Sequence, residues 1–200
     1  MRDRKQRERL ALEEKVLKQE FSDFNVHDRT GDTYISGPVT SPSFRDTYWL
    51  ILPIPEDYPD KMPEMYVERP APLYTSDGTL MPEISHVFHT MSRKSDCTQI
   101  CHGSDEDWDA SKTWISVLIR GHLWIHAFEQ HLRTGETIEE VYRRKYEEQD
   151  SGVGGHVVPS AVNVSLEAIQ LGDWNSISIN DIDITHLVTD EDVVIPWPQT

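Results

Sequence analysis

The chain has 200 residues, 37% hydrophobic and 27% charged, which is typical of a folded globular protein with one domain and room for an appendage. Its net charge of −16 argues against a nucleic-acid partner, whose phosphates are neutralised by Lys and Arg, and against an anionic membrane surface. The longest apolar run, residues 48–55, is too short to span a bilayer, and the charged N-terminus lacks the apolar core of a signal peptide. We therefore expect a cytoplasmic protein with no nucleic-acid or membrane partner.

The first third of the chain predicts a helix followed by a four-stranded antiparallel meander. Residues 3–21 place Leu10, Leu17 and Phe21 on one face of a helix. Four strand-like segments follow, each bounded by the Gly, Pro, Asp or Ser residues that hairpins require: 24–27, 33–36, 47–54 and 65–68. A helix ahead of such a meander predicts an α+β domain with the helix against one face of the sheet.

The rest of the chain predicts an irregular segment, two helices and an appendage. Residues 71–107 lack periodicity, and a loop of this length in a compact domain is usually functional or disordered. Helical periodicity returns at Ser111 and ends at Thr134-Gly135, and a shorter helix over 138–148 follows. We expect one domain over residues 1–149, a linker over residues 150–156, and an acidic, strand-like or extended appendage over residues 157–200.

Two motifs of the predicted domain carry a resemblance to a known family. Residues 55–63 have the pattern Pro-x-x-Tyr-Pro-x-x-x-Pro around Tyr58, directly after a strand. Ile100-Cys101-His102 ends the long irregular segment, and Trp108 follows Cys101 by seven residues, ahead of a helix. In this order and spacing, residues 1–148 resemble the ubiquitin-conjugating enzymes, and among them most closely the bacterial ubiquitin-conjugating-like proteins.

This resemblance implies that Cys101 accepts the C-terminal carboxyl of a ubiquitin-like modifier as a thioester and passes it to an amine of a protein target. A thiol suits the role because it is nucleophilic near neutral pH and its acyl ester stays reactive toward amines. The resemblance also implies an activating enzyme that docks on the N-terminal helix; it implies no cofactor and no metal. His102 beside the thiol is expected to favour the thiolate, and the acidic run 105–107 to raise the thiol pKa.

The chain departs from the family where the oxyanion of the transition state is stabilised. The eukaryotic enzymes have His-Pro-Asn ahead of the nucleophile, whereas this chain has His86-Val87-Phe88-His89 and no Asn nearby. Preorganised donors are needed at this point, and a His ring can supply one. The expected catalytic set is therefore Cys101, His89 and His86, supported by His102, Trp108 and Tyr58.

Other interpretations of the same residues stay open. Cys97 is a rival nucleophile, and Cys101 is alternatively a buried small hydrophobe. The missing Asn favours a catalytically inactive variant of the fold, similar to ubiquitin-conjugating-enzyme variants or RWD domains, that acts as an adaptor for a protein partner. A third class is a zinc-stabilised binding module, because His86, His89, Cys97 and Cys101 are zinc-ligand types at permitted spacing.

Overall fold

The structure, a computed structural model, describes residues 2–150, with only the helical backbone for residues 145–150. Nearly all of the predicted linker and the whole predicted appendage lie outside the described residues, so the expected domain boundary stays a prediction. Over residues 2–150, no helix is both long enough and apolar enough to cross a membrane.

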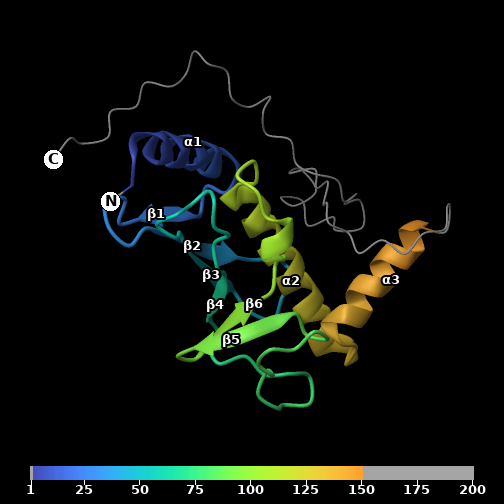
Figure 1. Ribbon diagram of the computed structural model, residues 1–200. Helices are drawn as coiled ribbons and strands as arrows, with labels where there is room; N and C mark the ends of the chain where they lie inside the picture. Colours follow the sequence, from blue (N-terminus) through green and yellow to red (C-terminus); the bar gives the residue numbers. More distant parts are fainter. Residues whose placement is uncertain (1, 151–200) are drawn as a thin grey trace.

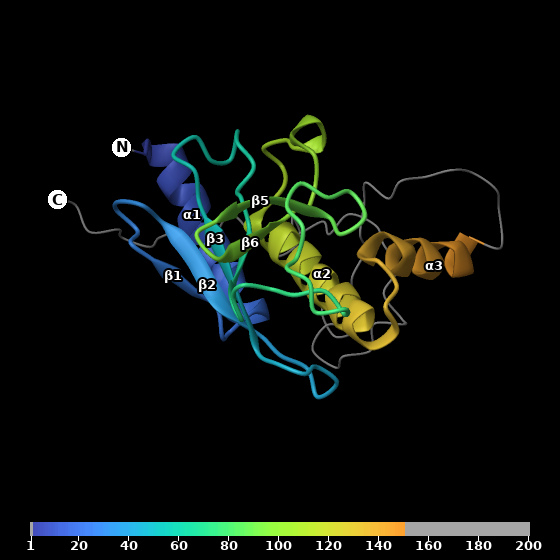
Figure 2. The same cartoon turned by 90° about the horizontal axis from the view of Figure 1, so that it is seen from below.

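The fold is α+β, with an N-terminal helix, a six-stranded antiparallel sheet and C-terminal helices (Figure 1). The elements follow in this order: α1 (Arg4–Glu20), β1 (Asn25–His27), β2 (Tyr34–Val39), β3 (Tyr48–Pro53), β4 (Tyr66–Arg69), β5 (Thr90–Lys94), β6 (Cys97–Ile100), the short 3-10 helix η1 (Asp105–Asp107), α2 (Trp114–Thr134) and α3 (Ile138–Asp150). The strand order is β1-β2-β3-β4-β6-β5. In both views α2 lies between the sheet and α3 (Figures 1 and 2).

The first four strands form the predicted meander, and a hairpin absent from the prediction extends it to six strands. This hairpin, β5–β6, lies inside the segment expected to be irregular, and β6 pairs with β4. In β5 only the first residue, Thr90, is buried, so the strand lacks the alternation of apolar and polar side chains that reveals strands in a sequence. A register shift between Thr90 and Arg93 obscures it further.

The helices begin and end at the residues that cap them. Asp3 accepts a hydrogen bond from the Gln6 N–H, and the Gln6 side chain accepts from the Asp3 N–H, which forms a capping box for α1. Thr113 caps α2 by accepting from the Ser116 N–H. Gly135 ends α2 in the left-handed conformation with φ 79°, which confirms the predicted stop at Thr134-Gly135.

A close approach of α2 to the sheet defines the core and fixes the elements that carry the site. A Cβ added at Gly121 would lie 2.6 Å from Met65 Sδ and 2.7 Å from Leu50 Cδ1, so a larger residue there would displace these two side chains, which come from β3 and from the residue before β4. Along the same helix, the rings of Trp124 and Phe128 stack at 5.3 Å. The helix α3 packs in turn on α2, and Trp124 of α2 donates through Nε1 to the Phe88 carbonyl, directly ahead of His89.

Candidate active site

Cys101 directly follows β6, and strand pairing brings His89 beside it although the two are twelve residues apart in sequence. The register pairs Thr90 with Ile100. One step further, the Cys101 N–H donates a hydrogen bond of 2.8 Å to the His89 carbonyl. The nucleophile candidate and the histidine are therefore neighbours across the open end of one hairpin.

Contacts from α3 fix the His89 ring. Its Nε2 lies 2.7 Å from Oε2 of Glu139, and the ring packs edge-on against Tyr142 with centroids 5.2 Å apart. Glu139 therefore engages Nε2 and leaves Nδ1 as the other nitrogen of the ring. The backbone of His89 has φ 48°, a left-handed conformation that non-glycine residues seldom adopt and that often marks functional sites.

The thiol of Cys101 and the imidazole of His89 shift each other's pKa in opposite directions. A side-chain hydrogen bond to His89 is the main reason that the pKa of Cys101 is lowered, against the opposing effect of burial. The same hydrogen bond is the main cause that raises the pKa of His89, and Glu139 raises it further. The arrangement therefore favours a thiolate beside an imidazolium, which is the reactive form of a cysteine nucleophile.

Glu139 reaches the site because the first turn of α3 docks on the segment that carries His89. The Glu139 N–H donates to the Val87 carbonyl at 3.0 Å. One residue further, Glu140 accepts the Thr137 N–H at 2.7 Å and caps the start of α3. Two adjacent carboxylates thus have different tasks, since Glu140 holds its own helix and Glu139 holds His89.

A positive charge that the sequence did not reveal lies against the backbone after Cys101. Arg120 of α2 donates through Nη1 to the His102 carbonyl at 2.7 Å, and its charge contributes to the lowered pKa of Cys101. A Cβ at Gly103 would lie 2.7 Å from this Nη1, so glycine leaves the space that the guanidinium occupies. The Cys101 thiol itself lies 3.6 Å from the Gly103 carbonyl oxygen.

His102 does not support the thiolate as expected. Its ring is buried, its Nε2 lies 2.8 Å from the Pro63 carbonyl oxygen, and burial lowers its pKa to about 4. A neutral imidazole supplies no charge to Cys101. The acidic run 105–107 is exposed, and the pKa of Cys101 is lowered rather than raised as the sequence suggested, because His89, Gly103 and Arg120 all act to lower it.

The side chain of His86 is exposed, and its carbonyl accepts the His89 N–H at 3.3 Å. It therefore shapes the turn that positions His89. A role for the His86 ring at the oxyanion stays a prediction.

Cys97 lies at the opposite end of β6 in a different electrostatic environment. Burial, together with the charges of Glu68 and Asp96, raises the pKa of its thiol. Four residues of strand separate the two cysteines by about 13 Å at the usual rise, so they cannot share one metal ion. Within residues 2–144, no three His, Cys, Asp or Glu side chains are grouped to hold a metal, and the geometry does not favour the zinc interpretation.

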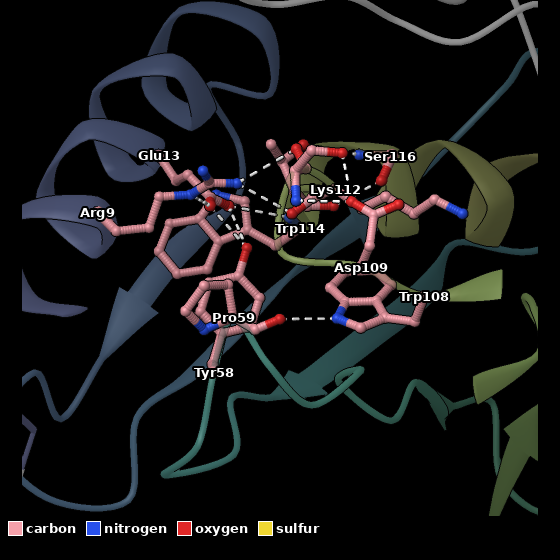
Figure 3. A network of polar contacts seen from close by, with 11 residues as sticks. Arg9, Glu13, Tyr58, Pro59, Trp108, Asp109, Lys112, Trp114 and Ser116 are labelled. Carbon is pink, nitrogen blue, oxygen red and sulfur yellow. Dashed lines mark hydrogen bonds and ion pairs between the residues drawn. The ribbon is translucent and has the colours of Figure 1, made fainter. Parts of the chain in front are cut away.

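Tyr58 and Trp108 belong to a network that ties α1 to the proline-rich turn and to the segment after Cys101 (Figure 3). The Tyr58 hydroxyl donates to the buried Glu13 carboxylate, with O···O distances of 2.6 and 2.8 Å, and the Trp114 N–H donates to the same group at 2.9 Å. Trp108 Nε1 donates to the Pro59 carbonyl at 2.8 Å. Tyr58 and Trp108 therefore hold these segments together, and their supporting role at Cys101 stays a prediction.

Scans against known protein families, curated proteins and solved structures find no match for the chain. Fold and site together define an α+β domain that brings together a cysteine directly after β6, a histidine directly before β5 and a glutamate in the first turn of α3.

Proposed function

We propose that this chain is a ubiquitin-conjugating-type acyl transferase, in which Cys101 carries the C-terminal carboxyl of a ubiquitin-like modifier as a thioester and passes it to an amine of a protein target. The observation that supports this most strongly is the position of His89 beside Cys101, whose N–H donates to the His89 carbonyl at 2.8 Å, together with the lowered pKa that His89 gives to the thiol. Adding support, the order of elements resembles that family: a helix, a meander, a proline-rich turn and a cysteine ahead of the last helices.

In this function each residue has a definite task. The Cys101 thiolate attacks the carbonyl carbon of the activated modifier and forms the new C–S bond, and the activating enzyme's thiol leaves with the proton that His89 holds. An amine of the target then attacks the Cys101 thioester, the C–S bond breaks to release the Cys101 thiolate, and His89 takes up the proton that the amine loses. Arg120 and His89 stabilise that thiolate in both steps.

An activating enzyme is the first partner that this function requires. The N-terminal end of α1 presents Arg4 and Lys5 to solvent, although Arg4 also pairs with Glu8 at 2.7 Å. We assign this end of α1 as the docking site for that enzyme. The modifier and the protein target complete the set of partners.

A second candidate is the catalytically inactive adaptor. It is favoured by the distribution of apolar side chains, since all the exposed large hydrophobic residues of the described chain fall within residues 74–91: Tyr74, Leu80, Ile84, Val87 and Met91. Such a concentration on one segment is typical of a protein-binding surface. This surface is compatible with an enzyme as well, because both would bind a modifier.

Loading with the modifier tests the proposal and separates it from the adaptor. The chain is incubated with its activating enzyme, the modifier and ATP, and the products are resolved with and without a reducing thiol. We expect a thiol-sensitive adduct that Cys101→Ala abolishes and the matched control Cys97→Ala retains. An adduct that survives Cys101→Ala contradicts the proposal, and binding of the modifier without any adduct favours the adaptor.

A further inference from the structure

We infer that the site also hydrolyses the acyl group it accepts, with Cys101, His89 and Glu139 acting as a catalytic triad that uses water as the acyl acceptor. The substrates are activated acyl esters and thioesters. The inference rests on the proposed function in one respect, because both need an acyl group on Cys101. It goes further in assigning a base and an orienting carboxylate that a carrier of acyl groups does not require.

Contacts to both the backbone and the ring hold His89 in place. Its N–H donates to the His86 carbonyl at 3.3 Å, and its carbonyl accepts the Cys101 N–H at 2.8 Å. Its ring is held by Glu139 at 2.7 Å and packs against Tyr142. Backbone and ring are thus both fixed toward one thiol, and such preorganisation is what catalytic bases need.

Glu139 has the role of the third member of the triad. Its Oε2 accepts a hydrogen bond from Nε2 of His89, so in the neutral ring the lone pair lies on Nδ1. Its charge also contributes to the raised pKa of His89, which makes the ring a stronger base. Glu139 acts through His89 and is a positioning residue.

Once Cys101 is acylated, a base beside it can activate water. A lowered thiol pKa alone is enough to form the thioester and to hand it to an amine. A base fixed beside the acyl carbon removes a proton from any nucleophile that reaches it, and water reaches a half-buried cysteine without a docking surface. The triad therefore limits the lifetime of the thioester.

The reaction balances without a further reactant. In acylation, Sγ of Cys101 bonds to the carbonyl carbon of the substrate, the ester or thioester bond breaks, and the leaving group takes the proton from His89. In deacylation, Nδ1 of His89 takes a proton from water, the water oxygen bonds to the acyl carbon, and the C–S bond breaks. The products are a carboxylic acid and an alcohol or thiol, and Cys101 and His89 return to their starting state.

The test uses the full chain carrying Cys97→Ala, so that one thiol remains, and p-nitrophenyl acetate as the acyl donor. A burst of p-nitrophenolate measures acylation, and the steady rate that follows measures deacylation by water. We expect a burst of one equivalent followed by turnover, both abolished by Cys101→Ala.

Glu139→Gln identifies the triad. We expect it to keep the burst, to lower the steady rate at pH 7 about tenfold, and to move the acid limb of the pH profile to lower pH because His89 loses the charge that raises its pKa. Glu140→Gln removes the same charge from the same helical turn and is expected to leave both unchanged. Circular dichroism of each variant checks that it folds.

The outcomes separate the two proposals. A burst without turnover overturns the hydrolytic inference and leaves the acyl carrier standing. Turnover that Glu139→Gln leaves unchanged in rate and pH profile overturns the triad alone. The absence of any burst from Cys101 overturns both.

Discussion

The two ends of β6 carry the two cysteines of the chain and give the same functional group opposite properties. At the C-terminal end, Cys101 faces His89, and the pKa of its thiol is lowered. At the N-terminal end, burial of the Cys97 thiol and the charges of Glu68 and Asp96 raise its pKa. Both side chains are of intermediate exposure, so exposure alone does not distinguish them.

Side chains that other elements place beside each thiol decide which of the two cysteines is reactive. The residue next in sequence to Cys101 is His102, yet its ring is bonded to the Pro63 carbonyl and stays neutral. The histidine that contacts the thiol is His89, which the β5–β6 hairpin and α3 hold in place. Substitutions near either end of β6 test this difference between the two thiols.

The largest effect is expected from His89→Asn, which removes the imidazole while keeping a residue type that tolerates the left-handed backbone. The pKa of the Cys101 thiol should rise toward its ordinary value, and its alkylation by iodoacetamide at pH 7 should slow about tenfold. Alkylation of Cys97 should not change. The control is His86→Asn, and an equal loss of Cys101 reactivity in that variant would exclude the pairing with His89.

A smaller effect is expected of pH on the free energy of unfolding, through His102 beside Cys101. The folded-state pKa of His102 is about 4, below the unfolded value, so the unfolded chain takes up its proton first as pH falls below 6.5. The charges of Arg120 and Asp105 act on the same ring. The stability contribution is present above pH 6.5 and is lost as pH falls toward 4, which amounts to about 0.7 kcal/mol between pH 7 and 6.

Urea unfolding of the parent chain and of His102→Gln at both pH values measures this contribution. The variant should lose that part of the pH dependence, because its amide donates to the Pro63 carbonyl without titrating. An unchanged pH dependence would show that His102 is not buried in its neutral form.

The smallest effect is expected from Asp96→Asn at the Cys97 end. Burial is the main reason that the pKa of Cys97 is raised, and the charge of Asp96 adds to it. Its removal should speed the alkylation of Cys97 about twofold at pH 7 and leave Cys101 unaffected. A tenfold change would mean that charge, and not burial, keeps Cys97 unreactive.

Local signals in the sequence predict most of the fold. The stop at Gly135 and the four strands of the meander follow from turn residues and periodicity. The β5–β6 hairpin could not be predicted in this way, because β5 buries only Thr90. Its polar pattern is the same as that of a loop.

The candidate site was predictable only in part. The sequence points to Cys101 and to His89, whereas Glu139 and Arg120 come from elements far along the chain. An acidic residue in the first turn of a helix ordinarily serves as a cap, as Glu140 does, so nothing local distinguishes Glu139. Only the docking of α3 on the Val87 carbonyl brings it to His89.

The most direct test of the difference between the two ends is alkylation of both cysteines in the same unmodified chain across a range of pH. Iodoacetamide labelling followed by peptide mass spectrometry gives the two rates side by side under one set of conditions. Because the thiol pKa is lowered for Cys101 and raised for Cys97, the structure predicts that Cys101 reaches half of its maximal alkylation rate at a lower pH than Cys97 does. Equal midpoints, or a lower one for Cys97, would contradict the assignment of Cys101 as the nucleophile.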